Sequence, residues 1–329
     1  MTPLIDTFGR THDNLRISVT DRCNIRCFYC MPEEGVKFEP KQHVLTFEEI
    51  ERFARVAVSL GVRKVRLTGG EPLLRRDLAK LVRKVNAIEG IEDLALTTNG
   101  VLLAAQAREL YAAGLHRINV HLDTLDRARF QQITRRDDFG PVMEGIEEAL
   151  RVGYNLKINA VAVKNLVEPD IVPLARFGRE NGIEIRYIEF MPLDAQGLWE
   201  KDKVLLADDM IAMIEREIGP LRPIPDQDPR APATEYAFED GIGRVGFIAS
   251  VSRPFCLNCN RIRLTADGKF RYCLFAIEET DIRTLLRDGS PDSAIAAAIR
   301  QSVREKWIGH QINTPQFVPP PRPMYSIGG

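Results

Sequence analysis

Residues 15–30 read Leu-Arg-Ile-Ser-Val-Thr-Asp-Arg-Cys-Asn-Ile-Arg-Cys-Phe-Tyr-Cys. The run from Leu15 to Thr20 is rich in β-branched side chains and predicts a strand. Three cysteines, Cys23, Cys27 and Cys30, follow it in the spacing C-x3-C-x2-C. Thiolates favour zinc, copper(I) or iron–sulfur clusters. Three of them leave one position of a metal or cluster open, which is typical of a catalytic site rather than a structural one.

Alternating strands and helices follow this loop as far as residue 190. Further short apolar runs predict strands at 64–68, 94–98, 117–122, 156–163 and 183–190. Helical segments are expected at 46–60, from 77 to 85, after residue 98 as far as Gly114, at 142–152 and at 171–181. Six β/α units predict a parallel sheet, whereas a complete barrel needs eight. We therefore expect an α/β fold, an incomplete (β/α)6 TIM-type barrel that stays open and is capped by another part of the chain.

The pattern changes at about residue 193. The expected elements beyond it are a proline-rich loop at 220–232, strands at 234–250 around a turn at 241–243, a hairpin at 263–271 with Asp-Gly at its turn, and an amphipathic helix at 291–307. We expect two domains, a partial barrel at 1–200 and a C-terminal capping domain at 201–329.

The other cysteines form a second triad, Cys256, Cys259 and Cys273. Two sets of three in a chain of 329 residues do not match the even pairing of small disulfide-bonded secreted domains. They indicate two thiolate sites, each without a fourth cysteine. Zinc is an alternative at either triad, although structural zinc prefers four ligands and no histidine lies within ten residues of either triad.

Composition and charge are those of an ordinary globular protein, with 44% hydrophobic residues, 28% charged residues and a formal net charge of −1. A chain so close to neutrality has no overall field that would attract nucleic acid or a membrane surface. The N-terminus shows no secretory signal, and no apolar run has the length of a membrane span. We therefore expect a cytoplasmic protein.

Polar and glycine-rich motifs stand where four other predicted strands end. They are Gly69-Gly70-Glu71-Pro72, Thr98-Asn99-Gly100, His121-Leu122-Asp123 and Met191-Pro192. With the first triad they lie at the carboxyl ends of parallel strands, which form the active-site rim of a β/α barrel. The glycine pair would let backbone approach a ligand closely, and Glu71 could pair with a ligand ammonium. Asp123 and Asp126 could simply cap the next helix.

The first 200 residues resemble the core of the radical S-adenosylmethionine (SAM) enzymes, and nearly the whole chain resembles the GTP 3′,8-cyclase family. The matching motifs are residues 18–23, 29–32, 66–72, 97–100 and 188–192, the second triad with residues 260–263, and the final Gly-Gly. The resemblance implies a lyase that catalyses the first step of molybdenum cofactor biosynthesis. Hydrogen would be abstracted from C3′ of GTP and the carbon radical would attack C8, giving (8S)-3′,8-cyclo-7,8-dihydroguanosine 5′-triphosphate.

The resemblance also implies the residues of the site. Two [4Fe–4S] clusters are expected, the first on Cys23, Cys27 and Cys30 with SAM on its open iron, and the second on Cys256, Cys259 and Cys273 with its open iron towards the guanine. SAM contacts are expected from Tyr29, Gly70, His121 and Met191. GTP contacts are expected from Arg16, Arg66, Thr97, Lys157, Arg261, Ile262 and Arg263. Arg261, Arg263, Gly328 and Gly329 are expected to take part in catalysis.

One position departs from the family. His121 stands where many members have serine, so it could donate a hydrogen bond to SAM or only fill space. The charge pattern agrees with a triphosphate ligand, because residues 63–84 hold eight basic and two acidic residues and residues 253–272 hold five and one. Arg261 and Arg263, two apart on a predicted strand, share a face, although such a pair away from cysteines would more simply be a solvated face.

The family further implies partners. These are a low-potential electron donor such as flavodoxin or ferredoxin, hand-off of the product to cyclic pyranopterin monophosphate synthase, and a homodimer, with no nucleic-acid or membrane partner. One alternative is a peptide-modifying radical SAM enzyme, which would usually carry more cysteines in its C-terminal part. A second alternative is a non-catalytic iron–sulfur or zinc carrier. The final Gly-Gly could be a frayed end, and His12 and His310 receive no role.

Overall fold

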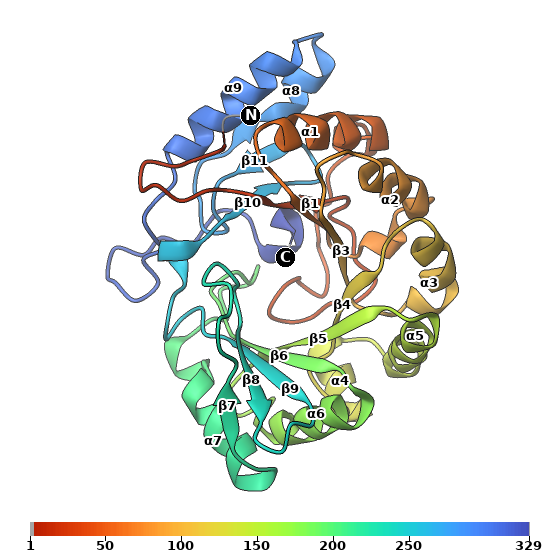
Figure 1. Ribbon diagram of the computed structural model, residues 1–329, viewed down its shortest axis with the longest axis vertical. Helices are drawn as coiled ribbons and strands as arrows, with labels where there is room; N and C mark the ends of the chain where they lie inside the picture. The colour runs from red at the N-terminus through yellow and green to blue at the C-terminus, as the bar shows by residue number, and fades with distance from the viewer. Residues whose placement is uncertain (1–2, 329) are drawn as a thin grey trace.

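One twelve-stranded sheet runs through residues 3–328, the part of the chain that this computed structural model describes (Figure 1). Its centre consists of six parallel strands that lie side by side in chain order. They are β1 (Asn14–Ser18), β2 (Lys64–Thr68), β3 (Asp93–Thr98), β4 (Arg117–His121), β5 (Asn155–Ala162) and β6 (Glu184–Glu189). The predicted six-unit α/β core is confirmed.

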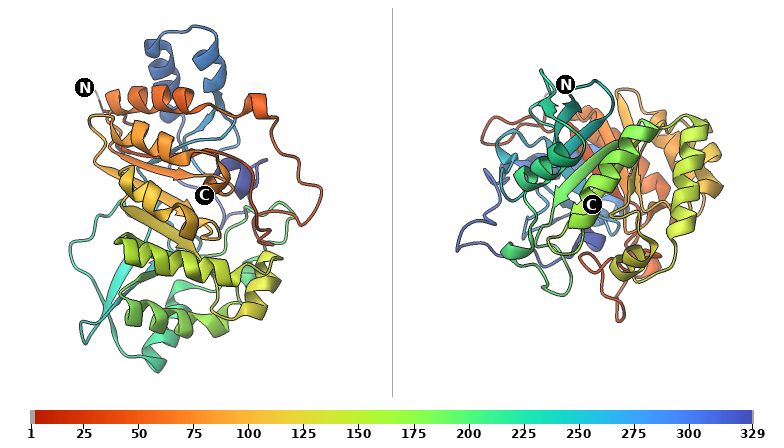
Figure 2. Two further views of the ribbon diagram at one scale, coloured as in Figure 1. Left: turned by 90° about the vertical axis from the view of Figure 1, so that its right-hand side faces the viewer. Right: turned by 90° about the horizontal axis from the view of Figure 1, so that it is seen from below.

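Helices link these strands and cover the outer face of the curved sheet (Figures 1 and 2). They are α1 (Phe47–Ser59), α2 (Leu78–Asn86), α3 (Leu103–Ala112), α4 (Arg127–Thr134), α5 (Phe139–Val152) and α6 (Glu168–Asn181). Helix α1 begins with a capping box, in which the side chains of Thr46 and Glu49 each accept a hydrogen bond from the other's backbone N–H. Asp126 caps α4 in the predicted way by accepting from the N–H of Arg129.

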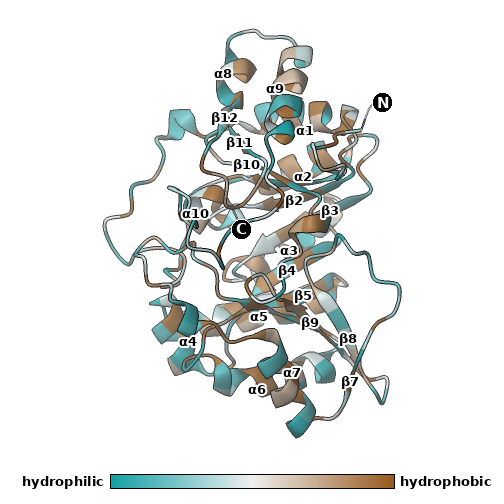
Figure 3. Ribbon diagram, turned by 90° about the vertical axis from the view of Figure 1, so that its left-hand side faces the viewer, coloured by the Kyte–Doolittle hydropathy of each residue, from teal (hydrophilic) through white to brown (hydrophobic). Residues whose placement is uncertain are grey.

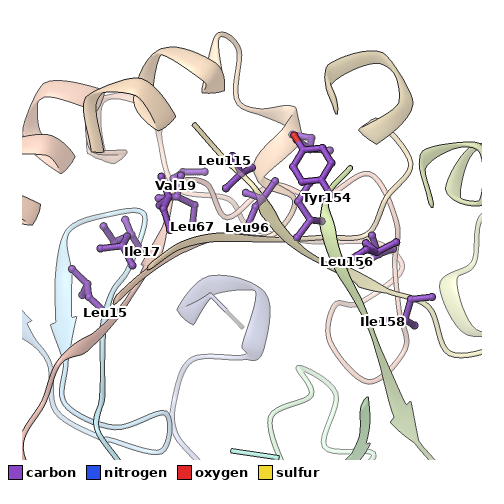
Figure 4. Close-up of a cluster of buried hydrophobic side chains, with 14 of the residues drawn as sticks. Leu15, Ile17, Val19, Leu67, Leu96, Leu115, Tyr154, Leu156 and Ile158 are labelled. Carbon is purple, nitrogen blue, oxygen red and sulfur yellow. The ribbon is translucent and has the colours of Figure 1, made fainter. Parts of the chain in front are cut away.

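The hydrophobic core lies between the sheet and these helices. Because successive residues of a strand point to opposite faces, Leu15 and Ile17 of β1 are fully buried under the helices while Arg16 faces the inside of the barrel. Leu67 and Leu96 continue the same layer on the neighbouring strands (Figure 4). This alternation leaves every second position of each strand to line the interior.

The C-terminal part of the chain adds strands to both edges of the sheet. Strand β9 (Arg244–Ile248) lies parallel to β6 and is followed outward by β8 (Thr234–Phe238) and β7 (Leu221–Pro223). Strand β10 (Arg261–Leu264) lies parallel to β1 and is followed by β11 (Lys269–Arg271) and β12 (Thr280–Asp281). The sheet therefore stays open, as expected. The domain boundary at residue 200 stays a prediction.

The remaining helices are α7 (Ala207–Glu217), α8 (Ile282–Arg287), α9 (Asp292–Arg304) and α10 (Met324–Ile327). The predicted hairpin at 263–271 and the predicted helix at 291–307 are confirmed as β10–β11 and α9, whereas the predicted loop at 220–232 contains the short strand β7. Several helices carry both hydrophobic and hydrophilic residues, as helices packed on one side do (Figure 3). In the described residues we find no helix with the length and apolar character needed to cross a membrane.

Candidate active site

The first cysteine triad lines a cavity at the carboxyl ends of the central strands. Cys27 is buried, Cys23 and Cys30 are partly buried, and all three thiols are free. The loop is anchored to the end of α4, because the backbone N–H groups of Arg26 and Phe28 donate to the carbonyls of Thr134 and Ile133, with N···O distances of 2.8 and 3.1 Å. Three soft donors therefore face one interior space.

All four residues expected to contact SAM line this cavity, namely Tyr29, Gly70, His121 and Met191. The glycine is required by packing against the cysteine loop. A Cβ atom at Gly70 would lie 2.3 Å from the carbonyl oxygen of Arg22, and a Cβ at Gly69 would lie 2.6 Å from that of Thr20. The glycine pair thus lets the turn after β2 sit directly against the backbone that leads into Cys23.

Glu71 does not point into the cavity. It is fully buried, and its carboxylate accepts hydrogen bonds from the N–H of Leu73, the hydroxyl of Thr98 and the N–H of Asn99 at 2.9, 2.7 and 2.7 Å. Burial raises the pKa of Glu71 to about 7, against the lowering effect of these bonds. Both oxygens are occupied by the chain itself, so Glu71 ties the β2 turn to the end of β3 rather than presenting a free carboxylate to a ligand.

His121 belongs to a hydrogen-bonded group at the cavity wall. Its Nε2 contacts the hydroxyl of Tyr29 and lies 3.1 Å from Oδ2 of Asp123, and the Tyr29 hydroxyl donates to the same oxygen at 2.5 Å. Burial lowers the pKa of His121, but Asp123 and the Cys27 thiol outweigh burial and raise it well above its usual value. Asp123 also accepts from the N–H of Val161 at 2.7 Å, so it braces this group rather than capping a helix.

Within the first triad, Cys23 lies beside neutral and acidic groups, whereas Cys27 lies beside His121. Burial, with the nearby Glu71 and Cys27, raises the pKa of Cys23 to about 12. The side-chain amide of Asn99 donates to Cys23 Sγ at 3.7 Å, and this amide also holds the side chain of Asn24 at 2.8 Å. Asn99 was not predicted as a site residue, although its place at the end of β3 could have indicated a position beside the first triad.

The second triad lines a larger cavity deeper in the same barrel. The two cavities have volumes of about 1050 and 1680 Å³, including space open to solvent. They share the lining residues Thr97, Asn159, Ile188, Met191 and Met324. Cys256, Cys259 and Cys273 therefore face a space continuous with the one in front of the first triad, although the two sets of cysteines lie more than 200 positions apart in the sequence.

Three arginines lie in one row across the inner face of the sheet. The register places Arg16 of β1 directly opposite Arg66 of β2 on one side and Arg263 of β10 on the other. Burial and repulsion by Arg263, Arg66 and Arg261 lower the pKa of Arg16, and burial with neighbouring arginines lowers the pKa of Arg66 and of Arg263 to about 10. Like charges directly opposite each other destabilise a sheet. A bound anion would therefore stabilise this row of arginines.

The other charged side chains around the second cavity are also mainly positive. Among the described residues around the second cavity, nine are arginine or lysine and three are aspartate or glutamate. Lys157 lies 2.5 Å from Oε2 of Glu184 and 3.4 Å from Oε1 of Glu235, so its charge is partly balanced by the chain. Thr97 and Arg261 also line this cavity. The side chain of Ile262 points away from the cavity and is fully buried in the hydrophobic core. Only its backbone, paired with β1, is left to contact a ligand.

Three further lining residues were not predicted as site residues, namely Arg186, Asn159 and Arg117. Arg186 is buried on β6 and is paired with Glu184 and Glu235, in each case at 2.5 Å. The Oδ1 atom of Asn159 is buried and has no hydrogen-bond partner among the described residues. Each is a polar residue at an inward position of a strand in which polar and apolar residues alternate, and that periodicity was the signal available.

The second triad differs from the first in its electrostatic surroundings. Burial raises the pKa of the Cys259 thiol, but Arg261 and Lys306 outweigh burial and lower it to about 6. Nη2 of Arg261 donates to Cys259 Sγ at 3.3 Å, and the guanidinium lies 4.6 Å from the centre of the Phe255 ring. Two cations therefore favour the thiolate form of Cys259, the form that binds metals.

The C-terminal tail enters the barrel between the two triads. In Figure 1 the C-terminus lies inside the ring of strands. The carbonyl of Gly328 accepts from Nη1 of Arg263 at 2.8 Å, and a Cβ on Gly328 would lie 2.7 Å from that of Ser18. Gly328 has φ of +88°, a conformation that favours glycine. The frayed-end alternative is therefore wrong for Gly328, and Gly329 lies outside the described residues.

The donor chemistry of both triads fits an iron–sulfur cluster. Each offers three free thiols to an interior space and leaves one position for a non-protein ligand. Within residues 3–328, no group of three or more His, Cys, Asp and Glu side chains is arranged to hold a metal ion. The assignment of an iron–sulfur cluster to each triad therefore rests on its three thiols and on the cavity that they line.

Family models match two consecutive parts of the chain. Residues 17–178 match the radical SAM superfamily, and residues 183–312 match the family described as Molybdenum Cofactor Synthesis C. The crystal structure of Streptococcus suis SuiB bound to S-adenosylmethionine has a TM-score of 0.61 and 17% identity, over 90% of this chain and 69% of that one. This likeness supports the radical SAM fold and nothing more specific.

Sequence relatives are much closer. Over 99% of its length the chain is 49% identical to the GTP 3′,8-cyclase of Rhodopirellula baltica and 47% identical to GTP 3′,8-cyclase 2 of Mycobacterium bovis. Each match covers 92% of the relative. With the matches to both family models, this similarity shows that the chain belongs to the GTP 3′,8-cyclase family of the radical SAM superfamily.

Proposed function

We infer that this chain is a radical SAM enzyme that cyclises GTP to (8S)-3′,8-cyclo-7,8-dihydroguanosine 5′-triphosphate, the first step of molybdenum cofactor biosynthesis. Family membership over nearly the full length supports the reaction. One observation of the structure carries the nucleotide part of the proposal. It is the row of Arg66, Arg16 and Arg263 across the inner face of the barrel.

This row suits a triphosphate for electrostatic reasons. A buried set of like charges is costly when it faces no anion, and arginine guanidinium groups bind phosphate oxygens in pairs. We propose that Arg16, Arg66 and Lys157 hold the triphosphate, with Thr97 and the β10 residues Arg261 to Arg263 completing the GTP site. Ile262 would contribute through its backbone only, because its side chain is in the core.

The first triad is proposed to hold the cluster that binds SAM. When bound there, a [4Fe–4S] cluster with SAM supplies the radical chemistry, which the protein itself does not. The chain's part is to orient SAM through Tyr29, Gly70, His121 and Met191 and to shield the reacting atoms. The cavity in front of the triad is lined by these residues and by apolar side chains such as Ile25 and Phe190, which exclude water.

The second triad is proposed to hold a second [4Fe–4S] cluster, with its open iron towards the guanine. Arg261 and Arg263 would act at the ribose and base, and the tail with Gly328 and Gly329 would complete this end of the site. Support comes from the continuous cavity and from the contact of Arg263 with Gly328. In this arrangement the nucleotide lies between two clusters.

Several finer points belong to the same proposal. We propose a low-potential electron donor such as flavodoxin or ferredoxin, hand-off of the product to cyclic pyranopterin monophosphate synthase, a homodimer and a cytoplasmic location. We also propose the division at residue 200 into a radical SAM part and a C-terminal part. The two family-model matches, which meet near residue 180, support a division in this region.

Anaerobic reconstitution tests the proposal. The chain should bind about eight irons, four for each cluster, and should release 5′-deoxyadenosine from SAM in the presence of GTP. Parallel reactions with ATP and without nucleotide should release much less. Binding of four irons contradicts the second cluster, and release that does not respond to GTP contradicts the substrate.

A further inference from the structure

A buried lysine lies behind the second triad, and no carboxylate among residues 3–328 pairs with it. Lys306 is 3% exposed, and its Nζ lies 2.8 Å from the carbonyl oxygen of Arg261, 3.5 Å from Cys259 Sγ and 3.5 Å from Nδ1 of His12. These three acceptors use all three protons of an ammonium group. Burying an ammonium without a negative partner is costly, and among these acceptors only the Cys259 thiolate can carry a negative charge.

The N-terminal segment orients this lysine. His12 is fully buried, and its Nε2 lies 3.0 Å from Oδ2 of Asp6. Since an ionised carboxylate only accepts hydrogen bonds, Nε2 carries the proton and Nδ1 is left as the acceptor that faces Lys306. Asp6 in turn accepts from Nε of Arg10 at 2.6 Å, so the carboxylate is held in place.

Arg10 binds the same region from a second side. Its Nη1 donates to the carbonyls of Cys256 and Ile308 at 2.7 and 2.8 Å, and its Nη2 donates to that of Trp307 at 2.6 Å. Residues 6–12 therefore connect the loop of the second triad with the chain around Lys306. At the first triad the donor to Cys23 Sγ is the neutral amide of Asn99, and the guanidinium of Arg26 donates to the backbone carbonyls of Cys23 and Ile25.

We propose that Lys306, oriented by His12 and Asp6, is a positioning residue of the second thiolate site that donates a charged hydrogen bond to Cys259 and raises the reduction potential of the cluster held there. This inference rests on the second cluster of the proposed function. Hydrogen bonds to cluster sulfurs and nearby charge are known determinants of cluster potential. A fixed positive charge stabilises the reduced cluster, because reduction adds a negative charge.

The test needs a signal from the second cluster alone. In the full-length chain with Cys23→Ala, Cys27→Ala and Cys30→Ala, only the second triad can hold a cluster, and about four irons per chain are expected. A redox titration followed by electron paramagnetic resonance then gives its midpoint potential. In this background Lys306→Met should lower the potential, so that the ratio of reduced to oxidised cluster at a fixed potential falls about tenfold, or 59 mV for one electron.

Matched variants separate charge from packing. Lys306→Arg keeps the charge and the donors, so it should keep most of the potential, and Lys201→Met removes a lysine from an exposed turn, so it should change nothing. Should Lys306→Met fail to bind iron, Lys306→Gln takes its place, because its amide can still donate to the Arg261 carbonyl without a charge.

The outcomes distinguish this inference from the proposed function. A background chain without iron contradicts the second cluster and, with it, the role of Lys306. Four irons with the same potential in wild type, Lys306→Met and Lys306→Gln overturn the role of Lys306 alone. Loss of iron in the Met, Gln and Arg variants also overturns it, because a role that depends on charge requires the arginine variant to work.

Discussion

The two cysteine triads offer the same three thiols, but Cys23 of the first and Cys259 of the second lie in opposite electrostatic surroundings. Around the first, burial and Glu71 raise the pKa of Cys23 to about 12, and the donor to that sulfur is the neutral amide of Asn99. Around the second, Arg261 and Lys306 lower the pKa of Cys259 to about 6 against burial. Identical ligands therefore do not define identical sites, and the neighbouring charges distinguish them.

This difference matches the ligands that each site is proposed to bind. SAM carries a positive sulfonium and little net charge, so it needs fewer cations around it than a triphosphate does. GTP carries a triphosphate, so the cations that surround the second triad suit GTP. The cationic surroundings also favour a reduced cluster, and we expect a higher reduction potential at the second triad than at the first.

The largest expected effect separates the triads directly. Cys27→Ala should abolish SAM cleavage, because it removes a ligand of the SAM-binding cluster. Cys259→Ala should impair GTP turnover and leave some SAM cleavage, because the first cavity is intact. The measurement is 5′-deoxyadenosine and cyclised product from each variant after anaerobic reconstitution. Equal behaviour of the two variants would mean that the triads do not divide the work as proposed.

The arginine row gives the next effect. Arg16→Met removes the central charge of the row, so GTP affinity should fall about 30-fold or more, as expected for loss of about 2 kcal/mol or more from a buried charged contact. SAM affinity should stay within about twofold, since Arg16 lines only the second cavity. Calorimetry of each ligand measures both, and Arg108→Met on the outer face of α3 is the control for loss of one charge. A parallel loss of SAM affinity would contradict separate sites.

The tail gives a smaller effect at the boundary between the two cavities. In Gly328→Ala the new Cβ would lie 2.7 Å from that of Ser18 at a φ of +88°, so the tail must shift away from Arg263. Turnover should fall about tenfold, while iron content stays unchanged. Gly289→Ala is the control, because Gly289 has φ of +85° with no atom within 4 Å of its Cβ position. Equal activity of both variants would show that the tail position does not matter.

The last prediction concerns stability near the second triad rather than activity. Burial, together with Lys306 and Arg10, lowers the pKa of His12 from 6.5 to about 4, although Asp6 raises it. Between these values the unfolded chain takes up a proton that the folded chain does not. The free energy of unfolding of the metal-free chain should therefore fall by about 3 kcal/mol from this residue as pH drops from 6.5 to 4.

Urea unfolding at several pH values measures this term, and His12→Phe should flatten the dependence in that window. A wild-type chain whose unfolding midpoint is as pH-independent as that of the variant would contradict a neutral buried His12. This pH dependence reports on the surroundings of the second triad, because the groups that face His12 are Asp6, Arg10 and Lys306.

Local patterns predicted much of the molecule. The six β/α units, the open sheet, the hairpin at 263–271 and the cysteine triads all follow from short-range periodicity and spacing. Pairing between distant segments did not follow. Nothing in the local sequence indicates that β10 lies beside β1, yet that pairing alone completes the row of Arg16, Arg66 and Arg263.

The same limit explains the missed second-triad residues. His12 and Lys306 are 294 positions apart and each looks like an ordinary residue in its own segment. Only the folded chain shows that Lys306 is buried beside Cys259 and that His12 is buried beside Lys306. Glu71 shows the converse, since its motif suggested a ligand contact while the folded chain uses its carboxylate to join two loops.

The most direct test of the central claim is whether GTP reaches the second triad. In the full-length chain with Cys23→Ala, Cys27→Ala and Cys30→Ala, the paramagnetic resonance spectrum of the reduced second cluster should change when GTP is added. SAM should leave it unchanged, because its proposed cluster is missing. A chain that binds four irons but whose spectrum is the same with and without GTP would contradict a nucleotide held between the two sites.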